Sequence, residues 1–155
     1  MTELAELFRR DLTRLMQELQ AFSGEDALWR VAPGVTNSAG NLTLHVEGNL
    51  REYVGRQLGH VPYTRQRNLE FSLRALPAGD LVQRIGAVKE LVPGIVAGLS
   101  PAQLEAMYPE MVFGAHISTR QLLLSLYGHL NYHMGQIDYL RRILTGGTGI
   151  KFAGL

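Results

Sequence analysis

Residues 118–145 read STRQLLLSLYGHLNYHMGQIDYLRRILT, and this stretch predicts the last long helix of the chain. Ser118 and Gln121 have the spacing of a helix N-cap, and Gly146 with Gly147 ends the pattern. Between them, apolar side chains recur every three or four residues, as on the buried face of a helix. The stretch therefore predicts an α-helix that packs one face against a core.

Two further long helices are predicted before residue 60. Apolar residues recur at helical spacing over residues 3–21. A second helix is expected to begin near Asn37 or Ser38, because either residue can cap its first turn, and it fades at Gly59. The stretch 60–76 has no clear period and contains a proline, so we expect an ordered loop that crosses between helices.

A third long helix before the last one is predicted from Asp80 and Gln83, which form a candidate capping box. Pro93 lies inside its apolar pattern, so we expect a kink or an early end there. Ser100, followed by a proline in the first turn, predicts a short extra helix. The one strand-like stretch is 111–113, so the chain is expected to be all-α.

These segments predict a four-helix bundle with long crossover connections at the second and third crossings, and with the short extra helix before the last long one. No internal repeat or low-complexity tract divides the sequence of 155 residues. We therefore expect one domain over residues 1–155.

Composition argues against several classes of protein. With 15 basic and 14 acidic side chains the formal net charge is +1, whereas nucleic-acid-binding proteins carry a clear basic excess. No apolar run approaches the ~20 residues that cross a bilayer, and residues 1–11 are amphipathic and charged rather than signal-like. We therefore expect a cytoplasmic protein with no nucleic-acid or membrane partner. Cysteine is absent while histidine occurs 5 times, so any metal site must use histidine, carboxylate or water.

His129 and His133 are four residues apart in the last helix, so both rings project from one face. This spacing brings two neutral imidazoles to one divalent ion without distortion of the backbone. It also fits two core histidines that are satisfied by hydrogen bonds, and the spacing alone leaves both interpretations open. Four leucines lie on much the same stripe, which places the pair toward the core: Leu122, Leu126, Leu140 and Leu144.

His45 favours the metal interpretation. It stands with Leu42, Val46 and Asn49 on the expected inward face of the second helix, where a polar ring needs a partner. Three inward histidines on two helices can meet around one ion, whereas without an ion each would need a separate hydrogen-bond partner. Three protein ligands leave positions open for water or substrate, which is the catalytic pattern.

Other polar residues are placed around this candidate site. Gln136 and Asn49 return to the faces of the histidines, so each is a candidate contact to a ligand or substrate, although simple packing fits equally well. Glu47 points to nearly the opposite side of its helix and is not counted as a ligand. His60 and His116 fall in expected loops and are taken as non-ligands.

The two histidine motifs resemble those of a known family. Residues 37–51, NSAGNLTLHVEGNLR, followed by residues 128–137, GHLNYHMGQI, resemble the DinB/YfiT-like superfamily of metalloenzymes. The match in order and spacing covers most of the chain. It includes Leu28 and Trp29 before a Pro-Gly loop, and the closing residues 140–144, LRRIL.

The resemblance implies a four-helix bundle of unusual crossover topology. It also implies a divalent metal ion held by three histidines, which match His45, His129 and His133, and homodimers, which are frequent in the family. Several characterised relatives are transferases or isomerases that use a low-molecular-weight thiol such as bacillithiol or mycothiol. The leading hypothesis is therefore a metal-dependent enzyme of the thiol-transferase type that acts on a small-molecule substrate.

Two alternatives stay open. A metal-dependent hydrolase would need a general base, and no carboxylate is clearly placed on the histidine faces. A metal- or small-molecule-binding stress protein would need no reaction. The sequence leaves the metal as zinc, nickel or iron, since all of them suit nitrogen ligands. In the thiol version the sulfur must come from a small molecule. The five arginines of residues 51–74 either help to hold an anionic cofactor or form a solvated surface.

Overall fold

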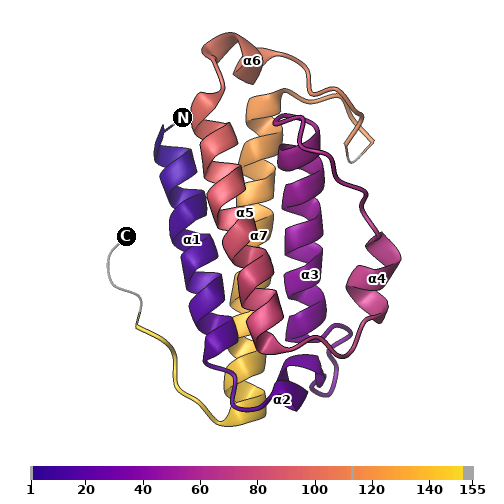
Figure 1. Ribbon diagram of the computed structural model, residues 1–155, viewed down its shortest axis with the longest axis vertical. Helices are drawn as coiled ribbons and strands as arrows, with labels where there is room; N and C mark the ends of the chain where they lie inside the picture. Colours follow the sequence, from indigo (N-terminus) through magenta and orange to yellow (C-terminus); the bar gives the residue numbers. More distant parts are fainter. Residues whose placement is uncertain (1, 113, 152–155) are drawn as a thin grey trace.

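The structure, a computed structural model, describes residues 2–112 and 114–151, and of Glu25 the backbone alone. In this part of the chain the regular elements are helices, and the all-α prediction is confirmed. They are α1 (Thr2–Gln20), α2 (Glu25–Trp29), α3 (Ala39–Leu50), the π-helix η1 (Arg51–Arg56), α4 (Arg67–Ser72), α5 (Ala78–Gly98), α6 (Pro101–Glu105) and α7 (Thr119–Thr145). Figure 1 shows α1, α3, α5 and α7 side by side along the long axis of the molecule.

The helix starts that are capped by serine, and the end of α7, lie where the sequence predicts them. The Ser118 side chain accepts a hydrogen bond from the Gln121 N–H at the start of α7, and Gly146 ends the helix with a φ of 70°. Ser38 caps α3 in the same way, and α3 continues without a break into η1. The short helix α6 begins after Ser100, which forms a reciprocal capping box.

The third predicted helix differs from the expectation at two points. Asp80 is not its cap, because the helix begins at Ala78 and the Leu81 N–H donates to the carbonyl of Pro77. The helix also does not end at Pro93 but continues to Gly98. Fully buried valines on both sides of the proline, Val88, Val92 and Val96, pack into the core, and their burial outweighs the ~3 kcal/mol that an interior proline costs.

The expected loop at 60–76 contains the helix α4, so that prediction was wrong for residues 67–72. Figure 1 places α4 on the outer side of α3, away from the other long helices. Side-chain hydrogen bonds from Asn41 of α3 to the backbone carbonyls of Glu70 and Leu73, at 2.9 and 3.0 Å, fix it there. The helix α4 has no amphipathic pattern of its own, so its sequence does not predict it. Tertiary contacts to α3 stabilise it instead.

The core lies between the long helices. Its fully buried side chains come mainly from α1, α5 and α7: Phe8, Leu12, Leu15, Leu19, Leu81, Ile85, Leu122, Leu123 and Ile137. The strand-like stretch 111–113 contributes one isolated bridge between Val112 and Ala115, and Phe113 lies outside the described residues. No helix within the described residues is long and apolar enough to cross a membrane. The helices α3, which carries His45, and α7, which carries His129 and His133, pack against each other (Figure 1).

Candidate metal centre

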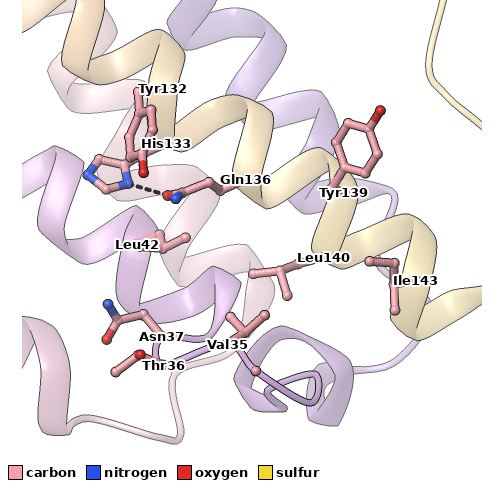
Figure 2. A pocket seen from close by; sticks show the side chains of 11 residues that line it. Val35, Thr36, Asn37, Leu42, Tyr132, His133, Gln136, Tyr139, Leu140 and Ile143 are labelled. Atoms are coloured by element: carbon pink, nitrogen blue, oxygen red, sulfur yellow. Dashed lines mark hydrogen bonds between the residues drawn. The ribbon is translucent and has the colours of Figure 1, made fainter.

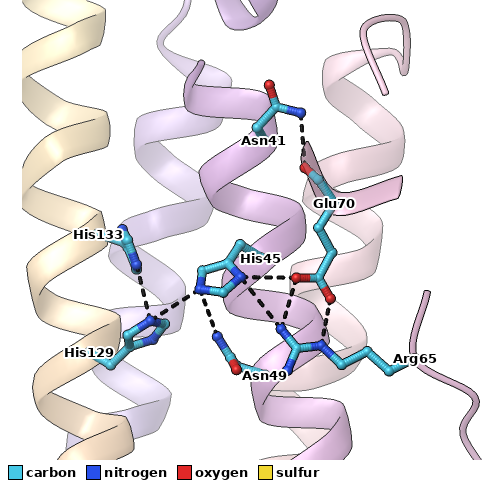
Figure 3. Close-up of polar contacts among 7 residues, drawn as sticks. All are labelled: Asn41, His45, Asn49, Arg65, Glu70, His129 and His133. Atoms are coloured by element: carbon cyan, nitrogen blue, oxygen red, sulfur yellow. Dashed lines mark hydrogen bonds and ion pairs between the residues drawn. The ribbon is translucent and has the colours of Figure 1, made fainter. Parts of the chain in front are cut away.

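Three histidine side chains from two helices meet between α3 and α7 (Figure 3). The Nε2 atom of His129 lies 3.2 Å from Nε2 of His45 and 3.0 Å from Nε2 of His133. One nitrogen from each of the three rings lies within 4.8 Å of the others. The structure thus brings together the three histidines that the sequence selected, and they form a group that could hold a metal ion.

Hydrogen bonds at Nδ1 determine which nitrogen of each outer ring carries the lone pair. Nδ1 of His45 lies 2.9 Å from Oε2 of Glu70, a carboxylate that can only accept. Nδ1 of His133 lies 2.7 Å from the amide oxygen of Gln136. Each Nδ1 therefore carries the proton and donates it, so Nε2 of His45 and of His133 presents a lone pair to the centre of the cluster.

The arrangement fits a divalent ion. Two nitrogens that share an ion at ~2.0–2.1 Å, at tetrahedral or octahedral angles, lie ~2.8–3.4 Å apart. The contacts of 3.0 and 3.2 Å fall in this range. An N–H of His129 can point to one neighbouring nitrogen at a time, whereas a cation accepts electron pairs from all three rings. The donor set and the two separations at His129 therefore suit a metal.

The cluster also keeps its rings in the form that binds metal. Burial lowers the pKa of His129 to about 4. A positive charge on His133 or His45, and the charge of Arg65, act in the same direction. Burial also lowers the pKa of His133, although its hydrogen bond to Gln136 partly opposes that change. Both rings are therefore neutral at pH 7, as metal coordination requires.

Glu70 and Arg65 form an ion pair behind His45 that the sequence analysis did not identify (Figure 3). Arg65 donates to both carboxylate oxygens, at 2.6 and 2.8 Å, and the Glu70 side chain is 6% exposed. Burial raises the pKa of Glu70, but hydrogen bonds from Arg65 and His45 outweigh it, so the pKa lies below its usual value. Glu70 is therefore ionised at pH 7.

One sequence signal could have suggested this carboxylate. Gly48 lies three residues after His45 on a helix that is otherwise buried, and a glycine in such a place often admits another chain segment. A Cβ atom at Gly48 would lie 2.2 Å from Oε1 of Glu70, so the glycine makes room for the carboxylate. The glycine does not, however, predict which residue packs against it.

The other candidate residues are placed as follows. The side-chain amide nitrogen of Asn49 lies 3.0 Å from Nε2 of His45, a contact that coordination of an ion by this nitrogen would replace, and Gln136 contacts His133 as described above. Glu47 points away from the cluster and accepts hydrogen bonds from two arginines of α5 and η1. His60 and His116 are exposed in connecting segments and are not part of the cluster.

The arginines of residues 51–74 all contact groups of the chain itself. Arg65 is directed toward the histidine cluster through Glu70, and its Nη2 lies 3.4 Å from Nδ1 of His45. The remaining four contact glutamates, the ring of Phe71 or backbone carbonyls: Arg51, Arg56, Arg67 and Arg74. One arginine of this segment therefore acts on the candidate site through a second residue.

A cavity of about 520 Å³ reaches the edge of the cluster (Figure 2). His133 and Gln136 form part of its wall, and Val35, from the segment before α3, lies across from them. None of the described residues that line it is an Asp, Glu, Lys or Arg. The cavity therefore suits an uncharged group, with tyrosine hydroxyls and amides as its hydrogen-bonding groups.

The fold is shared with solved DinB-like proteins. A crystal structure of a DinB-like protein from Bacillus subtilis superposes with a TM-score of 0.71 at 16% identity, covering 97% of this chain and 96% of that one. A DinB-like protein from Bacillus cereus ATCC 10987 gives a TM-score of 0.72 at 15% identity, covering 96% and 94% of the two chains. The sequence matches no protein-family model and no curated protein. These likenesses confirm the fold that the histidine motifs suggested.

Proposed function

We propose that this chain is a divalent-metal-dependent enzyme of the thiol-transferase type, with the ion held by His45, His129 and His133. The observation that carries the proposal is the convergence of three Nε2 atoms, with separations of 3.0 and 3.2 Å at His129. Three protein ligands leave positions for a substrate. The shared fold with DinB-like proteins supports the proposal through the family resemblance of the two histidine motifs.

The chemistry is divided between the ion, a small thiol and the chain. A bound divalent ion favours the thiolate form of a coordinated thiol, which is the form that attacks an electrophile. The chain has no cysteine, so the sulfur belongs to a cosubstrate. Burial keeps the rings of His129 and His133 neutral, and Glu70 and Gln136 orient the rings of His45 and His133. We place the electrophilic substrate in the cavity beside His133, whose lining favours an uncharged molecule.

Elemental analysis tests the metal site. Protein stripped with a chelator, reloaded with zinc, nickel or iron(II) and dialysed should retain one ion per chain. His129→Ala should abolish this retention, because it removes the central nitrogen of the cluster. His116→Ala is the matched control, since His116 is exposed outside the cluster. A wild-type protein that retains none of these ions would refute the proposal, as would full retention by His129→Ala.

Thermal unfolding with added thiols tests the reaction class. A thiol that binds the loaded protein at 100 times its dissociation constant should stabilise it by about 2.7 kcal/mol. For a chain of this size that corresponds to a rise of roughly 5–11 °C in Tm. Cysteine, glutathione, bacillithiol and mycothiol are the probes, and chelated protein is the control. A loaded protein that none of them stabilises would refute the thiol version and favour a non-enzymatic metal-binding role.

The hydrolase alternative gains no support from Glu70. Both of its oxygens are held by Arg65, and it contacts His45 at Nδ1 rather than at the Nε2 atom that faces the cluster. A general base must reach the water that attacks the substrate. Glu70 therefore accepts a hydrogen bond from the ring of His45 and is not placed to act as a general base.

We also propose that the protein is a homodimer, which the family resemblance implies. Between residues 124 and 143, none of the exposed residues of α7 is charged. Large apolar and aromatic side chains stand among them, with exposed fractions of 56–65%: Leu124, Tyr132, Tyr139 and Ile143. Sedimentation velocity should give a dimer for the wild type and a monomer for Tyr139→Glu. A monomeric wild type at micromolar concentration would refute it.

A further inference from the structure

The three candidate ligands differ in what supports them at Nδ1. His133 has a neutral amide there, from Gln136, whereas His45 has the ionised carboxylate of Glu70 at 2.9 Å. We propose that Glu70, fixed by Arg65, is a positioning residue that orients His45 and strengthens it as a metal ligand. The inference rests on the proposed metal site and adds to it a residue from an element outside the long helices, α4.

The proton between Glu70 and His45 has a defined place. A guanidinium can only donate, so the contact of 3.4 Å between Nη2 of Arg65 and Nδ1 would require an unprotonated Nδ1. The carboxylate can only accept, and its contact of 2.9 Å is the shorter of the two. Nδ1 of His45 therefore donates to Glu70, which leaves the lone pair on Nε2. A carboxylate in this position also makes the imidazole a stronger electron donor.

Glu70 cannot leave this position by a simple rotation. Its side chain is 6% exposed and receives two hydrogen bonds from Arg65. Its oxygen occupies the space that a Cβ atom of residue 48 would need, so Gly48 and Glu70 are fitted to each other. The carboxylate is therefore built into the site, and its orientation toward His45 follows from the packing of α4 on α3.

The backbone of α4 is fixed by the same helix that carries His45. Asn41, one turn before His45, donates to the carbonyls of Glu70 and Leu73. The ring of Phe71 lies 5.0 Å from the ring of His45, between centroids. Because the docking of α4 and the orientation of His45 share these contacts, an ion that fixes His45 should in turn strengthen the docking of α4.

Metal affinity of two glutamate variants tests the proposal. Glu70→Gln keeps the shape and an accepting oxygen but removes the charge, and Glu70→Ala removes both. We expect the dissociation constant for zinc or nickel, measured by calorimetric titration, to rise about 10-fold in Glu70→Gln and up to about 100-fold in Glu70→Ala. Glu47→Gln is the matched control, because Glu47 is similarly buried and also accepts two hydrogen bonds from arginine, here from Arg51 and Arg84, but contacts no histidine.

A glycine variant displaces Glu70 without changing it. Gly48→Ala would bring a Cβ atom to 2.2 Å from Oε1 of Glu70, so the carboxylate must shift from the position in which it contacts His45. We expect metal affinity to fall about 10-fold, as for a lost second-sphere hydrogen bond. Gly94→Ala in α5 is the control, because a Cβ atom there meets nothing within 4 Å.

Hydrogen exchange of the wild type distinguishes this coupling from a purely structural role of Glu70, which predicts no effect of the metal on α4. Loading with zinc should slow the exchange of the α4 amides, residues 67–72, more than that of α1, which lies outside the site. In Glu70→Gln this protection of α4 on loading should be lost.

The outcomes separate the inference from the proposed function. If the wild type binds metal and Glu70→Gln matches Glu47→Gln in affinity, the positioning role is refuted while the metal site stands. If loading leaves the exchange of α4 unchanged, the coupling is refuted. If the wild type binds no divalent ion, the metal site and the inference both fall.

Discussion

Acid should destabilise the metal-free protein through His129. Its pKa in the folded chain is about 4, against 6.5 in the unfolded chain. Above pH 6.5 the ring is neutral in both states and adds no pH dependence. Between pH 6.5 and 4 His129 binds a proton in the unfolded chain but not in the folded chain. The free energy of unfolding therefore falls as the pH falls. Each tenfold change in proton affinity corresponds to ~1.36 kcal/mol, so the difference between the two pKa values lowers the free energy of unfolding by about 3 kcal/mol.

Urea denaturation with a chelator present measures this loss. The free energy of unfolding is determined at pH 7 and at pH 4 for the wild type, for His129→Gln and for His116→Gln, whose histidine is exposed. We expect the decrease between the two pH values to be about 3 kcal/mol smaller in His129→Gln than in the wild type. His116→Gln should follow the wild type. An equal decrease in His129→Gln and the wild type would show that the buried cluster does not resist protonation as argued.

Three further results are expected. Gln136→Ala removes the acceptor of the His133 Nδ1–H and should weaken metal binding about 10-fold by calorimetry; unchanged binding would contradict the assigned proton. Arg141→Met leaves the fully buried carboxylate of Glu18 without its partner at 2.6 Å and should cost ~3–5 kcal/mol in urea denaturation; wild-type stability would refute this. Val35→Trp narrows the cavity beside His133 and should lower turnover while one ion per chain is retained; loss of the ion would contradict the separation of cavity and ligands.

The parts of the fold that the sequence predicts well are those with local signals. Ser118 and Gly146 bound α7 because a side-chain cap and a left-handed glycine act within one turn of the helix. The grouping of His129 and His133 follows from helical geometry alone. Their meeting with His45 required only that the inward faces of two helices pack against each other.

The parts that the sequence misses depend on tertiary contacts. Pro93 lies within a continuous helix because the buried valines around it are worth more than the hydrogen bond it lacks. Glu70 reaches His45 across 25 residues, from a short helix without a periodic pattern. No sequence spacing predicts such a contact. The same holds for the hydrogen bond from Arg65 to Glu70.

The separation of the candidate ligands along the chain bears on the order of folding and metal loading. His45 and His129 are 84 residues apart, and they become neighbours only when α3 has docked on α7. Before α3 docks on α7, helical spacing alone brings together only His129 and His133, which is an incomplete coordination sphere. We therefore expect folding to come first and loading second, so that metal occupancy distinguishes correctly assembled copies from the rest.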